Sequence, residues 1–186
     1  MPKYLITGVA GFIGSNIAHA LIARGEEVRG IDDLSHGRRE NIAGILNQFD
    51  FREADITDLP SIHSACEGVD YVLHQAALGS VPRSLDDPLA SNHANVVGTL
   101  SVLQAARDMK VKRVIYASSS SAYGDTPVLP KREDMASSPS RLMPFRNMQA
   151  SYMRRPFTRF LSLRRSASAI STCLARASIP RHNMPR

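Results

Sequence analysis

The amino-acid sequence predicts an α/β protein in which helices cover both faces of a doubly wound, parallel β-sheet. Apolar runs of strand length alternate with helix-like stretches over the first two thirds of the chain. A glycine-rich turn at 8–14 joins the first apolar run to the first helical stretch, and an acidic pair at 32–33 follows the second run. Because parallel strands need crossover connections and helices supply them, this alternation indicates βαβ units.

The expected strands are the apolar runs 3–7, 27–31, 51–54, 71–74 and 114–117. The first expected helix covers 15–24, because Ile17, Leu21 and Ile22 recur at helical spacing. Two further helix-like stretches, 59–67 and 91–109, separate the later strands. No internal repeat or low-complexity linker breaks this order before residue 136, so we expect one domain over residues 1–139.

Charge and composition change abruptly after Pro139. Residues 1–139 contain 13 Lys and Arg against 17 Asp and Glu, a net charge of −4, whereas residues 140–186 contain 10 Arg and no Lys, Asp or Glu, a net charge of +10. The second part also lacks Gly and Val, which ordinary domains use freely. We therefore expect a folded domain at 1–139 and an Arg- and Ser-rich tail at 140–186 that is largely disordered.

Several classes of protein are excluded by what the sequence lacks. No apolar run approaches the ~18 residues of a membrane span, and no signal-peptide pattern precedes the first strand, so we expect a cytoplasmic protein. The two cysteines, Cys66 and Cys173, match no metal-binding or redox spacing. We expect both to be buried or incidental thiols, and we expect no metal site.

The glycine turn at 8–14 (GVAGFIG) has the spacing of a dinucleotide-binding loop. Gly8 permits a tight turn after the first strand, Gly11 lets a pyrophosphate approach the backbone, and Gly14 lets the helix pack closely against the strand. The N-terminus of the following helix offers unpaired N–H groups and a partial positive charge to that pyrophosphate. Together with Asp32 at the end of the next strand, the turn predicts a Rossmann-type nucleotide site.

Asp32 stands 18 residues after Gly14, where an acidic side chain can accept hydrogen bonds from an adenosine ribose. A carboxylate at this point repels the 2′-phosphate of NADP, so NAD is the favoured cofactor. Arg38 and Arg39 lie just downstream and could bind a phosphate, which leaves NADP as the alternative. Asp33 is either a further cofactor contact or a solvated loop acid.

These motifs, with several others, resemble the extended short-chain dehydrogenase/reductase family of NAD-dependent nucleotide-sugar epimerases and dehydratases. The segments that carry the resemblance are 8–14, 32–35, 55–56, 74–77 and 118–124. Within the family, segments 77–84 and 129–131 are most similar to the UDP-N-acetylglucosamine 4-epimerase and UDP-glucose 4-epimerase groups. The resemblance covers residues 3 to about 139.

The resemblance implies residue roles at both ends of a cofactor cleft. The implied NAD contacts are Gly8, Gly11, Phe12, Ile13 and Gly14 at the pyrophosphate, Asp32 on the ribose with Asp33 beside it, Asp55 and Ile56 at the adenine, and Ala76, Ala77 and Asn95 along the cleft. On local grounds alone, Asp55 and Ile56 are as well explained as a turn acid beside a core isoleucine. The implied catalytic and sugar-binding residues are Ser119, Ser120 and Ser121, of which Ser119 matches the family's catalytic Ser or Thr, with Ser80 and Arg83 as further substrate contacts. We expect His74 to be a packed, hydrogen-bonded residue rather than a ligand, and Tyr123 to be a structural residue of its loop.

The chemistry implied by the resemblance is the reversible oxidation of a nucleotide sugar. In such epimerases a Tyr removes the 4-hydroxyl proton while C4 gives its hydride to NAD, and the hydride returns to the opposite face after the ketone has turned. The implied substrate is a UDP-sugar, with UDP-N-acetylglucosamine and UDP-glucose both open. A related dehydratase or decarboxylase is the alternative, although Ser119, Ser120 and Ser121 fit an epimerase better than the Asp-Glu pair of a dehydratase.

The family's Tyr-x-x-x-Lys motif, which supplies the general base and lowers its pKa, is absent from the sequence. The five tyrosines stand at positions 4, 71, 116, 123 and 152, and none has a Lys four residues later. Read one base out of frame, codons permitted for residues 141–152 encode Pro-Tyr-Ala-Val-Gln-Lys, which contains the motif. We therefore expect a frameshift near codon 139, with residues 140–186 as out-of-frame sequence.

Without that motif and without a substrate domain, we expect this chain to be catalytically defective. The alternative function is a non-catalytic NAD-binding fragment. We expect no membrane partner and no specific nucleic-acid partner, because clustered Arg binds phosphates non-specifically and no recognisable motif accompanies it here. Family dimers use two long helices, of which only that at 91–109 is present, so we expect a homodimer for the intact parent and not for this chain.

Overall fold

The structure is a computed structural model that describes residues 1–79, 81–117 and 130, apart from the side chains of residues 81 and 83. Five parallel strands form its sheet, in the order β3-β2-β1-β4-β5. They are β1 (Lys3–Thr7), β2 (Glu27–Asp32), β3 (Asp50–Glu53), β4 (Tyr71–His74) and β5 (Arg113–Tyr116). β1 is central, and its last residue, Thr7, is in register with Ile31 of β2 and His74 of β4. The winding of the chain reverses at β1, and sheets of this kind bind ligands at the carboxyl ends of the strands beside such a reversal.

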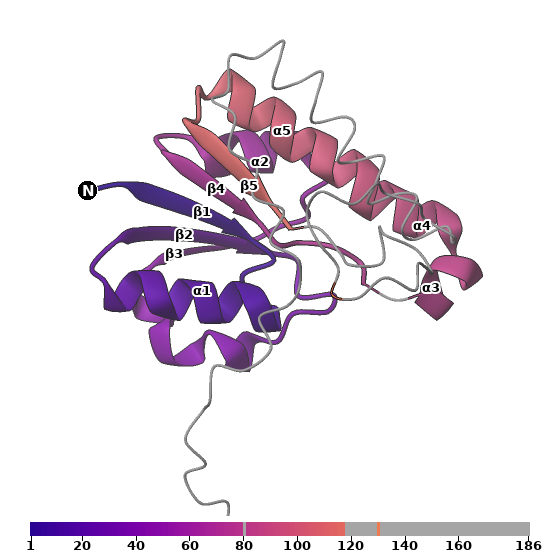
Figure 1. The fold of residues 1–186 in the computed structure, drawn as a ribbon, viewed down its shortest axis with the longest axis horizontal. Coiled ribbons are helices and arrows are strands. Elements are labelled where there is room, and N and C mark those ends of the chain that lie inside the picture. The colour runs from indigo at the N-terminus through magenta and orange to yellow at the C-terminus, as the bar shows by residue number, and fades with distance from the viewer. Residues whose placement is uncertain (80, 118–129, 131–186) are drawn as a thin grey trace, which may run out of the picture.

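Helices cover both faces of the sheet (Figure 1). α1 (Phe12–Ala23) and the 3-10 helix η2 (Ala43–Gln48) lie on one face, and α2 (Leu59–Cys66) and α5 (Gly98–Asp108) lie on the other. The remaining elements are η1 (Arg39–Asn41), α3 (Val81–Asp86), α4 (Pro88–Asn92) and a π-helical turn, η3 (His93–Val97), that continues directly into α5. The predicted doubly wound, parallel α/β fold is confirmed.

Strand boundaries differ from the prediction by at most one residue, but two helices differ more. α1 begins at Phe12 rather than at Ser15, because apolar periodicity does not reveal a first turn whose buried members are Gly14 and Ser15. The helix predicted at 91–109 begins at Pro88 and contains the π-helical turn. The predicted tail at 140–186 and the serine-rich segment at 118–124 lie outside the described residues.

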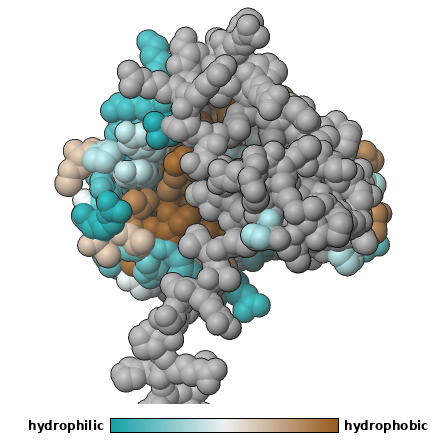
Figure 2. All heavy atoms as spheres, in the orientation of Figure 1, coloured by the Kyte–Doolittle hydropathy of each residue, from teal (hydrophilic) through white to brown (hydrophobic). Residues whose placement is uncertain are grey.

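The alternation of side chains along β1 divides the core into two apolar layers. Leu5 is buried with side chains of α2 and α5, whereas Ile6 is buried with side chains of α1 and η2. Successive residues of a strand point to opposite faces, so both layers are anchored on one central strand. On the face seen in Figure 2, a patch of apolar surface lies left of centre, with hydrophilic side chains above it, below it and to its left.

A buried arginine ties β2 to the end of α2. Nε of Arg29 donates to the carboxylate of Asp50 at 2.6 Å. One Nη donates to the carbonyl oxygens of Ser64, Ala65 and Glu67 at 3.3, 2.8 and 2.9 Å. Carbonyl groups at a helix end lack the full set of helical N–H partners, so the cation supplies donors at the end of α2, where the carbonyl group of Ala65 is buried.

The described residues contain no reactive thiol and no membrane helix. Burial raises the pKa of the Cys66 thiol to about 12, so this cysteine is a packing group, as predicted. Cys173 lies outside the described residues. In the described part of the chain, no helix is long and apolar enough to cross a membrane, and no group of His, Cys, Asp and Glu side chains could hold a metal ion.

Candidate functional site

β1 continues into the glycine turn, where three segments of the chain meet. Gly8 has a φ of +69°, which glycine adopts without strain, and its N–H donates to the carbonyl oxygen of Ile31 at 2.8 Å. A Cβ on Gly8 would lie 2.8 Å from the backbone of Ala76, and a Cβ on Gly14 would overlap the carbonyl oxygen of Gly8. The tight turn at Gly8 and the close packing at Gly14 match the prediction, and neither position has room for a side chain.

The N-terminus of α1 follows this turn directly. Gly11 is its N-cap, no described side chain caps the helix, and its first turn has no acidic residue. The free N–H groups and the helix dipole there favour an anion. The side chains of Phe12 and Ile13 are 77% and 38% exposed, and neither lines the adjacent pocket. Their predicted contacts with a cofactor therefore depend on their backbone N–H groups.

Asp32, the last residue of β2, joins the glycine turn to the loop that follows β2. Asp32 is 7% exposed, and its Oδ2 accepts a hydrogen bond from the N–H of Ala10 at 2.9 Å. Its Oδ1 accepts one from the N–H of Leu34 at 2.9 Å, and Leu34 has a φ of +59°. A left-handed backbone costs a non-glycine residue about 1–2 kcal/mol, which this hydrogen bond offsets in part. Asp32 is therefore both a structural clamp and a carboxylate at the pocket.

The segment after Asp32 also holds the peptide of Ala10 from its other side. The N–H of Arg38 and the Nδ2 of Asn41 both donate to the carbonyl oxygen of Ala10, at 3.0 and 2.7 Å. A Cβ on Gly37 would lie 2.6 Å from Oδ1 of Asp32 and 2.7 Å from Cβ of Ala10, so this approach needs a glycine. The middle of the glycine turn is thus fixed at both its N–H and its carbonyl group.

The two arginines that left NADP open do not line the pocket. Nη2 of Arg39 pairs with Glu53 at 2.5 Å, and its guanidinium lies 5.3 Å from the centroid of the Phe51 ring. Arg38 is exposed, and its backbone is engaged with the glycine turn. The Arg39 guanidinium is therefore held away from a ribose at Asp32, and the Arg38 side chain does not line the pocket.

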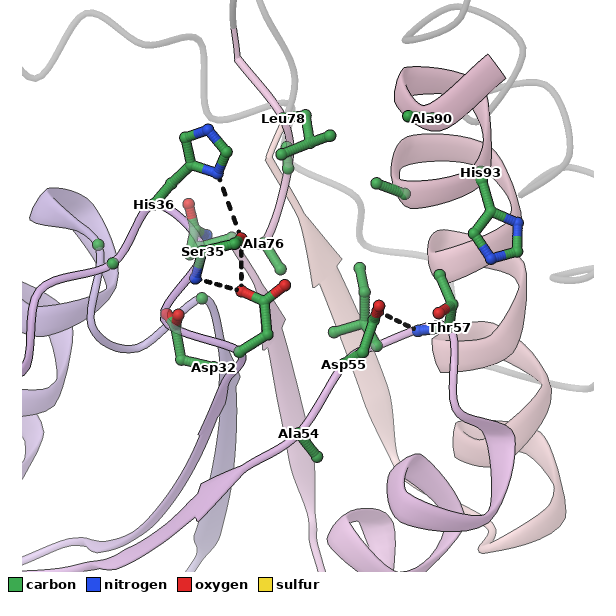
Figure 3. Close-up of a pocket in the computed structure, with 18 residues that line it drawn as sticks. Asp32, Ser35, His36, Ala54, Asp55, Thr57, Ala76, Leu78, Ala90 and His93 are labelled. Carbon is green, nitrogen blue, oxygen red and sulfur yellow. Dashed lines mark hydrogen bonds between the residues drawn. The ribbon is translucent and has the colours of Figure 1, made fainter. Parts of the chain in front are cut away.

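The opposite wall of the pocket comes from the segment after β3, α4 and the π-helical turn, and the connection after β4 lies between the two walls (Figure 3). Oδ1 of Asp55 accepts a hydrogen bond from the N–H of Thr57 at 2.8 Å. Ile56 is 8% exposed, and a Cβ on Gly98 would lie 2.6 Å from its Cδ1, so the helix approaches closely there. The close-up places Asp32, Ser35 and His36 on one side of the pocket, Asp55, Thr57 and His93 on the other, and Ala76 and Leu78 between them.

These walls enclose a pocket of about 410 Å³ at the carboxyl end of the sheet, a size typical of small-molecule sites. It is lined by eight of the predicted cofactor residues: Gly8, Gly11, Asp32, Asp33, Asp55, Ile56, Ala76 and Ala77. Sequence reasoning missed the other ten lining residues, which are Ser35, His36, Gly37, Ala54, Thr57, Gln75, Leu78, Ala90, His93 and Ala94. Their residue types are ordinary for loops and helix surfaces, so only the fold brings them to the site.

Asn95, on the π-helical turn, is buried but does not line the pocket. Its Oδ1 accepts from the N–H of Leu78 at 2.7 Å, and its Nδ2 donates to the carbonyl oxygen of Leu78 at 3.1 Å. The structure thus shows Asn95 holding a residue of the pocket wall, and its contact with a cofactor stays a prediction. Predictions for Ser80, Ser119, Ser120, Ser121, Tyr123 and the side chain of Arg83 fall outside what the structure describes.

A glycine turn against an open helix N-terminus, with a clamped carboxylate at the end of β2, defines a Rossmann-type dinucleotide-binding domain. Comparison with protein families agrees, since residues 4–148 match the NAD dependent epimerase/dehydratase family. The chain belongs to this family, as the resemblance predicted, and NAD is the cofactor on which the family depends. The matched segment continues nine residues past Pro139, where we expected the resemblance to end.

Two curated relatives illustrate the range of the family. The chain is 44% identical over 142 residues to a UDP-glucose 4-epimerase of Mycolicibacterium smegmatis, a match that covers 74% of this chain and 45% of that protein. It is 36% identical over 126 residues to a dTDP-glucose 4,6-dehydratase of Mycobacterium tuberculosis, over 66% of this chain and 38% of that protein. The chain therefore spans less than half the length of these relatives.

Solved structures show the same relationship. The UDP-glucose 4-epimerase from Brucella ovis in complex with NAD has a TM-score of 0.82 and 32% identity, over 88% of this chain and 50% of that one. The UDP-N-acetylglucosamine 4-epimerase from Methanobrevibacter ruminantium M1 in complex with UDP-N-acetylmuramic acid has a TM-score of 0.81 and 32% identity, over 87% and 52%. Fold and sequence thus assign the chain to the nucleotide-sugar epimerases and dehydratases.

Proposed function

We propose that this chain binds NAD in the pocket beside Gly8 and Asp32, and that it is the cofactor-binding part of a UDP-hexose 4-epimerase. The observation that carries the cofactor site is the carboxylate of Asp32, held at the pocket by the N–H groups of Ala10 and Leu34. The epimerase activity is supported by the relatives and solved structures that bear that name.

The shape of the site fits a dinucleotide. Gly8 and Gly14 leave no room for side chains between the turn and α1, so a pyrophosphate meets backbone N–H groups and the positive end of the helix dipole. The adenine is assigned to the wall at Asp55 and Ile56. When bound, NAD supplies an acceptor for a hydride from a sugar carbon, and the part of this chain is to bind and orient it.

Charge at the ribose favours NAD over NADP. Each oxygen of the Asp32 carboxylate accepts one backbone N–H and keeps a lone pair for a ribose hydroxyl. A 2′-phosphate there would meet that carboxylate and the neighbouring Asp33. Among the described residues that line the pocket there is no Lys or Arg to compensate.

A dehydratase is the second candidate, because dTDP-glucose 4,6-dehydratases are among the relatives. The serine run favours the epimerase, since a dehydratase of this family is expected to have an Asp-Glu pair where this chain has Ser119, Ser120 and Ser121. For the intact parent we propose a UDP-hexose as substrate, either UDP-glucose or UDP-N-acetylglucosamine.

For this chain itself we propose NAD binding without turnover. Its sequence contains no Tyr-x-x-x-Lys, and loss of an acid–base group costs about 10²–10⁴ in rate. A frameshift near codon 139 is our hypothesis for the missing motif, suggested by the motif that permitted codons encode one base out of frame.

Binding of NADH and NADPH, followed by cofactor fluorescence, tests the cofactor site. We expect the Kd for NADPH to exceed that for NADH by about tenfold or more, because a lost hydrogen bond and a like-charge contact are together worth at least ~1.4 kcal/mol. Asp32→Asn should weaken NADH binding by about tenfold, whereas Asp108→Asn, at the end of α5 away from the pocket, should change it less than about twofold. Equal affinity for the two cofactors, or no binding of NADH, contradicts the proposal.

Resequencing of codons 130–150 tests the frameshift, and an epimerase assay tests the activity. We expect one restored base to produce Tyr-Ala-Val-Gln-Lys, and the restored protein to interconvert UDP-glucose or UDP-N-acetylglucosamine with its 4-epimer. The 186-residue chain should show no turnover under the same conditions. An intact frame through codon 139 with no hidden motif removes the frameshift hypothesis, and turnover by this chain contradicts the defect.

A further inference from the structure

Next to the pocket wall, buried polar side chains connect β1, β4 and α5. His74 is 2% exposed, and its hydrogen bonds confirm the prediction of a packed histidine. Its Nδ1 lies 2.7 Å from Oγ1 of Thr7, and its Nε2 lies 3.0 Å from Oγ1 of Thr99. None of these three residues lines the pocket, so the cofactor site as described does not account for them.

The proton positions in this network follow from donor and acceptor chemistry. Oγ1 of Thr99 lies 2.6 Å from the carbonyl oxygen of Asn95, which can only accept, so the single hydroxyl proton of Thr99 is donated there. Towards His74, Thr99 can then only accept, which assigns a proton to Nε2 of the ring. Burial lowers the pKa of His74 to about 4, so the ring is neutral at pH 7 and its Nδ1 is an acceptor.

Both ends of the network reach the wall of the pocket. On one side Nδ1 of the ring accepts the hydroxyl proton of Thr7, whose Oγ1 accepts the N–H of Ala76 at 3.2 Å. On the other side Asn95 binds the N–H and the carbonyl group of Leu78. Ala76 and Leu78 both line the pocket and stand in the connection between β4 and α3. The donors and acceptors therefore form one continuous chain of hydrogen bonds. It begins at the N–H of Ala76 and ends at Asn95, whose side chain binds Leu78 in the same connection.

We propose that His74, as the neutral ring protonated on Nε2, is a positioning residue that sets the 75–79 backbone against the cofactor site. The π-helical turn serves the same purpose, since π-turns are frequent where a helix must redirect side chains at a site, and this one contains Asn95. Displacing any member leaves a buried polar atom without a partner, so the network favours a single arrangement. The inference rests on the proposed function in one respect: the expected change in NADH affinity requires the NAD site.

The first test measures the tautomer of His74 and the amide exchange of Leu78 in the full chain without nucleotide. Nitrogen-15 NMR of the histidine rings, assigned with His74→Gln, should show Nε2 of His74 protonated and Nδ1 not. Thr99→Val keeps the shape but removes the hydroxyl, so we expect loss of that tautomer preference and amide exchange of Leu78 about tenfold faster. Thr99→Ser keeps the hydroxyl and should restore both to within about twofold.

The second test is the Kd for NADH of the same variants. Thr99→Val should raise it about fivefold or more, and Thr99→Ser should leave it within about twofold. Val102→Ala, which truncates a fully buried apolar side chain of α5, is the control for general loss of stability and should change neither the ring nor the Leu78 exchange.

Four results overturn the inference. The first is a His74 ring protonated on Nδ1 in the unmodified chain, and the second is a Thr99→Val chain whose ring tautomer and Leu78 exchange are unchanged. The third is a Val102→Ala chain that changes the tautomer and the exchange as much as Thr99→Val does. The fourth is a Thr99→Val chain that binds NADH with an unchanged Kd. A chain that never binds NADH counts against the proposed function. The tautomer and the exchange are measured without nucleotide, so they still decide the role of His74 in that case.

Discussion

Replacing Gly37 by Ala tests whether the clamp formed by Asp32 shapes the cofactor site. The new Cβ would lie 2.6 Å from Oδ1 of Asp32 and 2.7 Å from Cβ of Ala10, closer than such atoms approach in real proteins. Because that same oxygen accepts the N–H of Leu34, a carboxylate that moves away from the new Cβ loses this hydrogen bond. A hydrogen bond to a charged group contributes about 1.5–3 kcal/mol, and overpacking costs about 1–3 kcal/mol more in stability.

Titration with NADH and unfolding in urea measure the two effects separately. To bind a ribose the displaced carboxylate must return to its clamped position, and that cost of about 1.5–3 kcal/mol corresponds to a Kd for NADH that rises about 10- to 100-fold in Gly37→Ala. Gly44→Ala is the matched control, because no atom lies within 4 Å of a Cβ at that position. We expect its NADH affinity to stay within about twofold and its stability within about 0.5 kcal/mol. Equal NADH affinity in the two variants would refute the reasoning.

Two predictions concern stability. Arg29→Met removes a charged donor from Asp50 and from three helix-end carbonyl groups, so the free energy of unfolding in urea should fall by about 2–3 kcal/mol. Arg52→Met, which removes a 31% exposed partner of the same carboxylate, should cost less than about 1 kcal/mol, and equal losses in the two variants would contradict the role of burial. For His74 the folded pKa of about 4 lies below the ordinary value of 6.5, so the unfolded chain takes up the proton first as the pH falls. The corresponding stability is present above pH ~6.5 and is lost at up to ~1.4 kcal/mol per pH unit down to about pH 4. His74→Gln should flatten that part of a stability-against-pH curve, and an unchanged slope would contradict a buried neutral ring.

The fold was predictable because its signals are local. Strand ends agree with the apolar runs to within one residue, since each run needs only its own residues to be recognised. The π-helical turn was not predictable, because the contacts around it join segments far apart in the sequence. Gly98 packs against Ile56, and Asn95 is hydrogen-bonded to Leu78.

By itself the sequence determined the class of the site: a glycine turn between strand and helix, and an acid at the end of the next strand, state their chemistry through spacing alone. The missing Tyr-x-x-x-Lys is also visible there and nowhere else. The tertiary structure alone decided that Asp32 is clamped by Ala10 and Leu34, and that Arg39 faces Glu53 rather than the pocket. It also decided that His74 joins two threonines far apart in the chain. The reason is that hydrogen bonds and ion pairs depend on distance in space, and residues 7, 74 and 99 become neighbours only when β1, β4 and the long helix are packed together.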